Sequence, residues 1–104
     1  MTAYLVVRAV VADPNDRAAF DRWYRLEHLP DAVKAFRAAA AMRGWSTVDP
    51  SVHTAYYRFD TLEQVQAISD SAEIRGLIAE FDRVWDSRVV RTRDIVAISD
   101  EMKG

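Results

Sequence analysis

The segment WYRLEHLPDA, Trp23 to Ala32, concentrates two aromatic residues, two acids and one of the chain's two histidines within ten residues. The helical pattern that leads into it meets Pro30, and a proline disfavours helical geometry in the residue before it. A helix is therefore predicted to stop or kink at Leu29, with another short helix over 30–39. Whether the segment serves chemistry or only packing depends on the elements around it.

The regions on either side of this segment alternate between strand and helix patterns. Runs rich in β-branched residues predict strands. Helix starts are marked by Asp13 as an N-cap before Pro14, and by the capping box from Thr61 to Gln64. The predicted strands cover 3–12, 41–49, 53–60 and 89–99, and the predicted helices cover 14–28, 62–69 and 72–86.

Two of these elements show which side chains share a face. Alternation along strand 53–60 places one set of residues on a common face, namely His53, Ala55, Tyr57 and Phe59. In helix 72–86, apolar residues recur at the spacing of a buried helix face, namely Ile74, Leu77, Ile78, Phe81 and Trp85. Both patterns predict a core between a sheet and helices.

The order of the elements is β-α-β-β-α-β, which predicts an α+β, ferredoxin-like fold in a single domain over residues 1–104. Two helices can cover only one face of a four-stranded antiparallel sheet. The other face would still carry valine, isoleucine and tyrosine side chains, and exposed apolar faces of that size mark interfaces. We therefore expect a homodimer formed through the open sheet face.

Composition excludes several classes of function. The formal net charge of −2 argues against a nucleic-acid partner, which would require a surplus of lysine and arginine. The absence of cysteine excludes disulfides, thiolate metal sites and cysteine nucleophiles. No segment approaches the ~20 apolar residues of a membrane span, and the N-terminal run is typical of a strand and not of a signal peptide. A cytoplasmic protein with no membrane partner is expected.

Within helix 14–28, Trp23 lies near the middle of an apolar stripe flanked by Ala19, Phe20 and Leu26. Glu27 falls within the same face, four residues from Trp23. A carboxylate in that position would be desolvated, which raises its pKa unless a nearby cation forms an ion pair with it. Glu27 is therefore predicted to be either a functional acid or base or half of a buried ion pair with a strand arginine, for which Arg8, Arg58, Arg91 and Arg93 are the candidates.

His28 lies at the edge of the same stripe, and three interpretations of it remain open. It could cap the carbonyls at a helix end, pack in the core, or act as an acid or base in a pocket. Asp31 is most simply an acidic residue in the first turn of the next helix, although a carboxylate can also orient an imidazole.

Other candidate groups give weaker signals. His53 follows a turn and is expected at the surface or the sheet edge. No metal site is predicted, because two histidines and the acids lack the spacing of a ligand set. The glycines are isolated, so no phosphate loop is present, and no serine lies in a nucleophile elbow. Trp45 and Tyr57 are candidates for an aromatic pocket, whereas Trp85 is expected in the core.

The pattern from Phe20 to Ala32 resembles the first-helix signature of the EthD-like group in the dimeric α+β barrel superfamily. Members carry an aromatic-rich first helix that ends in His-x-Pro, and Phe20, Tyr24, His28 and Pro30 match it. The resemblance implies a homodimer with packed sheets and a pocket between sheet and helices in each subunit. Relatives include lactone isomerases, polyketide cyclases and cofactor-free monooxygenases, and the histidine matched by His28 is thought to move protons in several of them.

The sequence departs from the superfamily in two ways, and both reduce the range of activities that the resemblance implies. Quinone-forming monooxygenases and haem-degrading members use an asparagine on an early strand, but the only asparagine here is Asn15, in the turn before the first helix. Haem-degrading members also need a histidine in the last helix, and 72–86 contains none. Both activities lose support.

Two hypotheses follow. In the first, the chain is an isomerase, cyclase or monooxygenase that needs no cofactor and acts on a small aromatic, lactone or polyketide-like ligand. His28 would be the general acid or base and Tyr24 or Glu27 would polarise the substrate, in a pocket shaped by Trp23, Trp45 and Tyr57. In the second, the chain is a non-catalytic dimeric binding or stress-related protein. A cavity of several hundred Å³ beside His28 would favour the enzyme, and a solid core around a hydrogen-bonded His28 would favour the alternative.

Overall fold

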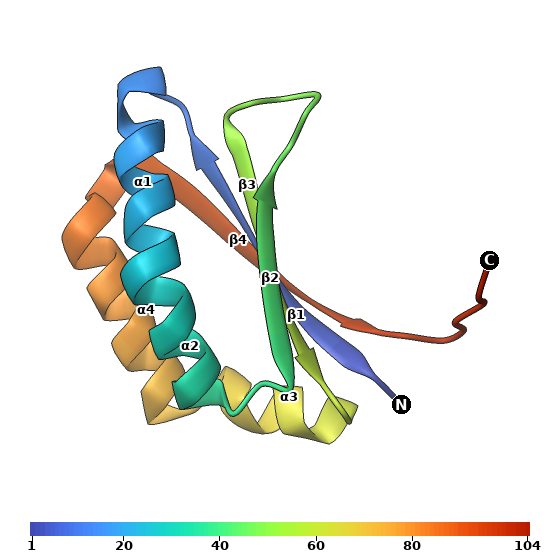
Figure 1. The fold of residues 1–104 in the computed structure, drawn as a ribbon. Helices are drawn as coiled ribbons and strands as arrows, with labels where there is room; N and C mark the ends of the chain where they lie inside the picture. The colour runs from blue at the N-terminus through green and yellow to red at the C-terminus, as the bar shows by residue number, and fades with distance from the viewer.

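In the computed structural model, which describes residues 1–104, four antiparallel strands form one sheet and the helices pack against one of its faces (Figure 1). The elements in chain order are β1 (Ala3–Val11), η1 (Pro14–Asp16), α1 (Arg17–Trp23), η2 (Tyr24–His28), α2 (Leu29–Phe36), β2 (Ala40–Trp45), β3 (Val52–Phe59), α3 (Leu62–Ser69), α4 (Ala72–Trp85), η3 (Asp86–Arg88) and β4 (Val89–Ala97). The predicted ferredoxin-like α+β fold is confirmed.

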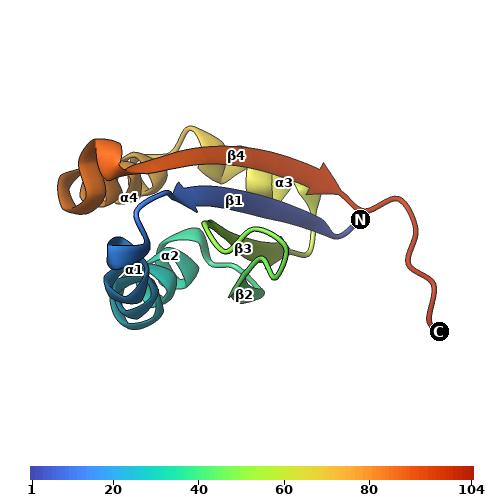
Figure 2. The same cartoon turned by 90° about the horizontal axis from the view of Figure 1, so that it is seen from above.

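The strands lie in the order β2-β3-β1-β4, so β1 and β3 form the centre and β2 and β4 the edges (Figure 2). Neighbouring residues across the sheet share a face. On the face that meets the helices, Leu5 pairs with Tyr57 on one side and with Ile95 on the other. Val7 likewise pairs with Arg93, and Ala9 pairs with both His53 and Arg91. Two arginines of β4 therefore lie on the core side of the sheet.

Local signals explain where most elements begin and end. The Asp13 side chain accepts a hydrogen bond from the Asn15 amide at the start of η1, as an N-cap does. Both hydrogen bonds of the capping box between Thr61 and Gln64 are present at the start of α3. The helix that ends at Phe36 is closed by Arg37 in the left-handed conformation, with φ of 55°.

An aromatic cluster forms the centre of the core. Phe20 is fully buried, and its ring lies within 6.2 Å of six other rings, measured between centroids. The predicted buried face of α4 is confirmed. Ile74, Phe81 and Trp85 are buried, whereas Leu77 and Ile78, at the middle of the same face, are only half-buried. A cavity beside them, described below, accounts for this difference.

The predicted stop at Leu29 is wrong, although the helix is irregular just before Pro30. The chain stays helical from Arg17 to Phe36 (Figure 1), because five residues, 24–28, form a wide π-helical turn in which the Leu29 amide donates to the Tyr24 carbonyl five residues back. The wider turn leaves room for the ring of Pro30, which would clash in an ordinary helix interior. Asp31 is exposed and lies inside this continuous helix, so it has no free helix start to stabilise.

The π turn also overturns the predicted burial of Glu27. The helical wheel assumed ~100° per residue throughout, and that angle does not hold through a wide turn. Glu27 is exposed, as are Ala19 and Leu26, which were expected beside Trp23 in the apolar stripe. Trp23 is buried, and the other buried positions fall every four residues, at Phe20, Tyr24, His28, Ala32 and Phe36.

No helix is long and apolar enough to cross a membrane. The face of the sheet away from the helices carries a cluster of apolar side chains, which we call the open-face cluster. It consists of Tyr4, Val6, Met42, Tyr56, Val96 and Ile98, which line a shallow hollow of about 390 Å³.

Candidate functional site: His28 and an adjoining cavity

His28 is held in the core by aromatic rings on three sides. Its imidazole stacks on Trp23 with 4.8 Å between ring centroids and an interplanar angle of 21°. Tyr24 and Phe81 meet the same ring edge-on, at 4.9 and 5.6 Å. The Nδ1 atom is buried and has no hydrogen-bond partner. A buried polar atom without a partner costs free energy, so it calls for an explanation beyond packing.

The surroundings of His28 favour its neutral form. Burial, together with the positive charge of Arg91, lowers the pKa of His28 to about 4, and Glu80 opposes the shift. Desolvation disfavours the charged imidazolium, so burial acts in the observed direction. At neutral pH His28 is therefore an uncharged imidazole that can accept a proton.

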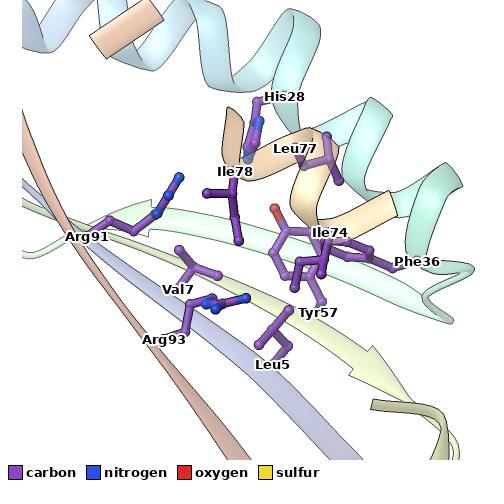
Figure 3. Close-up of a pocket in the computed structure, with 10 residues that line it drawn as sticks. All are labelled: Leu5, Val7, His28, Phe36, Tyr57, Ile74, Leu77, Ile78, Arg91 and Arg93. Carbon is purple, nitrogen blue, oxygen red and sulfur yellow. The ribbon is translucent and has the colours of Figure 1, made fainter. Parts of the chain in front are cut away.

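A cavity adjoins His28 between the sheet and α4 (Figure 3). Most of its wall is apolar and comes from β1, α4 and Phe36, while its polar groups come from His28, Tyr57, Arg91 and Arg93. Its volume is about 30 Å³, which is room for about two water molecules and far less than the ~300 Å³ at which ligand pockets begin. The structure thus lies between the two expected outcomes: His28 borders a cavity, but a small one.

Tyr57 links this cavity to the first helix. Its hydroxyl lies 2.9 Å from that of Tyr24, and either can donate. Burial raises the pKa of Tyr24 to about 12, and burial also raises the pKa of Tyr57. Both phenols therefore keep their protons at neutral pH. One proton joins the two oxygens, which leaves the other free to be donated to a bound group.

The other predicted site residues are placed differently. Trp23 reaches the site through its stacking on His28. Glu27 is exposed and does not line the cavity. Trp45 does not line the cavity either, and its indole Nε1 donates to the Asp21 carboxylate at 2.9 Å.

Trp45 belongs to a polar network that the sequence did not reveal. Arg43 donates to the Asp21 carboxylate at 2.7 Å, and this bond, with the one from Trp45, lowers the pKa of Asp21. Arg43 also lies 3.3 Å from Nε2 of His53. The expectation that His53 is at the surface or edge is wrong, because it is fully buried. Its core-side position follows from its alternation with Ala55 and Tyr57, which outweighs the nearby turn.

Arg91 and Arg93 were expected only as possible ion-pair partners for Glu27, and the structure makes them part of the cavity wall. The signal that could have identified this position is alternation: in β4, residues 89, 91 and 93 share the face of Leu5 and Val7. No group of three or more histidine, cysteine, aspartate or glutamate side chains is arranged to hold a metal ion.

Comparison with known proteins supports the fold. No protein-family model matches the sequence, and no curated protein matches it significantly. Among solved structures, an ethyl tert-butyl ether D (EthD) family protein from Bacillus halodurans is 19% identical, with a TM-score of 0.71, and the match covers 98% of this chain and 100% of that one.

Two further solved structures agree over nearly their whole length. SnoaB, a cofactor-independent oxygenase from Streptomyces nogalater, has a TM-score of 0.68 at 6% identity and covers 99% of this chain and 98% of its own. A protein from Deinococcus radiodurans assigned as an antibiotic biosynthesis monooxygenase has a TM-score of 0.65 at 10% identity, with 96% of each chain covered. The predicted resemblance is thus confirmed at the level of the fold: the chain has the ferredoxin-like α+β fold of an EthD family protein.

Proposed function

We propose that the protein is a homodimeric enzyme that moves a proton within a small aromatic, lactone or polyketide-like molecule without a cofactor, and that His28 is its general acid or base. The observation that carries this proposal is the unpartnered, buried Nδ1 of an imidazole that borders a cavity. Nδ1 of His53 and Nε1 of Trp85 are also buried without a partner, but of these three residues only His28 lines the cavity, where a ligand could reach it.

The geometry supports a simple proton transfer. Neutral His28 accepts a proton from a C–H bond next to a carbonyl, and the electron pair of that bond moves onto the carbonyl oxygen as an enolate. The Tyr57 hydroxyl, which lines the same cavity and keeps its proton, donates a hydrogen bond to that oxygen. The imidazolium then returns the proton to another carbon, which completes an isomerisation. Alternatively, the enolate carbon attacks an internal carbonyl, whose C=O electron pair moves onto oxygen, and the imidazolium protonates the resulting alkoxide, which completes a cyclisation.

The residues around His28 favour isomerase or cyclase chemistry over monooxygenase chemistry. No asparagine lines the cavity, and Asn15 is exposed in η1. The fold shared with the protein described as a cofactor-independent oxygenase therefore does not by itself support oxygenase chemistry here.

The small volume of the cavity favours a second candidate, a non-catalytic dimeric binding protein. At about 30 Å³ the cavity cannot enclose an aromatic ring as it stands. For the enzyme, a substrate must displace side chains of the wall, and the half-buried Leu77 and Ile78 of α4 are placed to move. For the binding protein, His28 would only fill space beside Trp23.

Proton–deuterium exchange separates the two candidates. We expect the protein to accelerate loss of the acidic C–H signal of small lactones and 1,3-dicarbonyl compounds in D₂O, followed by ¹H NMR. His28→Gln, which removes the base while keeping a similar size, should lower the rate by about 10²-fold or more. Glu27→Gln, one residue away but exposed, should leave the rate unchanged. Equal rates for wild type and His28→Gln would contradict the proposal.

A further inference from the structure

We propose that Arg91 and Arg93 form a recognition site for an anionic group at the mouth of the His28 cavity, so that the ligand of this site is a small organic carboxylate. The inference rests on the proposed function, because it names the substrate class of the same site. It starts from the unusual place of the two side chains: both arise from the core-facing positions of β4, opposite Ala9 and Val7. Charged residues on a core face are the exception, since such positions are normally apolar.

Arg91 is desolvated but poorly neutralised. Its side chain is only 16% exposed, and its guanidinium lies 4.1 Å from the ring centroid of Phe81. Its one ion pair, to Asp82, is long at 3.4 Å, and the Asp82 side chain is 64% exposed. Strong ion-pair hydrogen bonds are shorter, at about 2.7–2.9 Å. Burial lowers the pKa of Arg91, Asp82 opposes that shift, and the like charge of Arg93 adds to it.

Arg93 has no partner at all. It makes no hydrogen bond and no ion pair within the chain, and it lines the cavity together with Arg91 and His28 (Figure 3). Of the acids near the cavity, Glu80 is held by Arg83 at 2.6 Å. Arg91 has one weak partner and Arg93 has none, so the pair forms a site with excess positive charge, although the chain as a whole carries a net charge of −2. Guanidinium groups suit a carboxylate because they bind both of its oxygens at once.

The distribution of acids shows where the anion would lie. Arg93 and Leu5 also line a second hollow of about 390 Å³, on the outer side, between β4 and the turn that joins α3 to α4. Asp70 and Asp94 line that outer hollow, whereas no acid lines the His28 cavity. An anionic group is therefore favoured on the cavity side of Arg93 and disfavoured on the outer side.

The sizes of the two spaces agree with this arrangement. A cavity with room for about two water molecules suits a carboxylate, and the outer hollow is large enough for a ring. Because nothing holds the exposed Arg93 side chain, it can turn toward a carboxylate and open a path between the two spaces. The bound carboxylate would lie beside His28, with the carbon framework extending outward past Arg93.

Binding of benzoate and its neutral analogue benzamide tests the site without requiring turnover. We expect benzoate to bind, as measured by titration calorimetry or by ¹⁵N NMR shifts of residues 91–93, and benzamide to bind at least about tenfold more weakly. Arg93→Gln should weaken benzoate binding by about tenfold, the scale of one charge-assisted contact. Arg22→Gln, the same charge change at an exposed helix position with no ion pair or hydrogen bond, should have no effect.

Several outcomes would overturn the anion site. They are absence of benzoate binding, equal affinity for benzamide, and unchanged benzoate affinity in Arg93→Gln. Arg93 is exposed, so its substitution leaves the core intact, and equal thermal unfolding of the two glutamine variants confirms this. The two proposals also fail separately. Arg93-dependent benzoate binding without proton exchange would remove only the enzyme, whereas proton exchange with neutral and anionic carbon acids alike would remove only the anion site.

Discussion

At the scale of single residues, the two histidines make the stability of the fold depend on pH. Burial lowers the pKa of both His28 and His53 to about 4. The charged groups that act on His28 are Arg91 and Glu80, and those that act on His53 are Arg43, Asp21 and His28 itself when protonated. In each case the arginine opposes protonation and the acid favours it, but burial has the largest effect on the pKa. Each histidine therefore binds its proton more weakly in the folded state than in the unfolded chain.

We predict that the free energy of unfolding is greatest above pH ~6.5, the ordinary pKa of histidine, and falls as the pH decreases toward about 4. The sign follows because the unfolded chain binds more protons in this range. Each histidine should contribute a loss of at least ~1 kcal/mol, measured by urea unfolding at pH 7 and pH 4.5. His28→Gln should reduce the pH-dependent part of the loss, and an unchanged slope in that variant would contradict the buried, neutral imidazole.

Residue-scale patterns predicted some placements and missed others for a physical reason. Alternation along a strand correctly grouped Tyr57 and His53 on one face, but the turn beside His53 led to the wrong expectation that it is exposed. The same alternation in β4 places Arg91 and Arg93 on the side that faces the helices. Sequence reasoning missed this because charged side chains are normally assigned to the solvent side. Glu27 was misplaced because its position depended on helix geometry that changes within the turn before Pro30.

At the scale of elements, helix and strand starts with explicit caps were predictable, and the π turn was not. The capping box at Thr61 and the N-cap at Asp13 are complete in the sequence itself, so they needed no tertiary information. The π turn is different, because Pro30 marks a disturbance but does not determine whether the helix ends or widens. Packing decides: widening keeps Phe20, His28 and Phe36 on one buried face, whereas four-residue steps in a regular helix would drift by ~40° each.

We predict that the π turn makes Pro30 nearly neutral to stability. Pro30→Ala should change the free energy of unfolding by less than ~1 kcal/mol, because the wide turn already accommodates the ring. Lys34→Pro, at an exposed position in the ordinary turns of the same helix, should cost ~3 kcal/mol, since it removes a helical hydrogen bond and clashes with the preceding turn. Urea unfolding measures the free energy of unfolding of both variants. Similar losses in the two would indicate that the wide turn at 24–28 does not accommodate the ring of Pro30.

At the scale of the whole molecule, the strand order followed from the sequence, because six elements in the order β-α-β-β-α-β leave few ways to form one sheet. The size of the cavity did not follow. The cavity size depends on how far Leu77 and Ile78 extend toward Tyr57, and the spacing of apolar residues in the sequence does not predict that distance. The open sheet face was also predictable, and the structure shows what it carries: the open-face cluster, with Met42, Tyr56 and Val96 each at least 40% exposed.

That cluster is the basis of the last prediction, that the chain forms a homodimer through the open sheet face. Exposed apolar side chains gathered on one face favour association with a second copy, and a chain of 104 residues gains proportionally much from burying them. Light scattering should give twice the monomer mass of 11.8 kDa. Val96→Glu, which places a charge within the cluster, should give a monomer and lower the unfolding midpoint. Val48→Glu, at a 94% exposed position in the turn before β3, should remain dimeric, so a wild-type monomer or a dimeric Val96→Glu variant would rule out this interface.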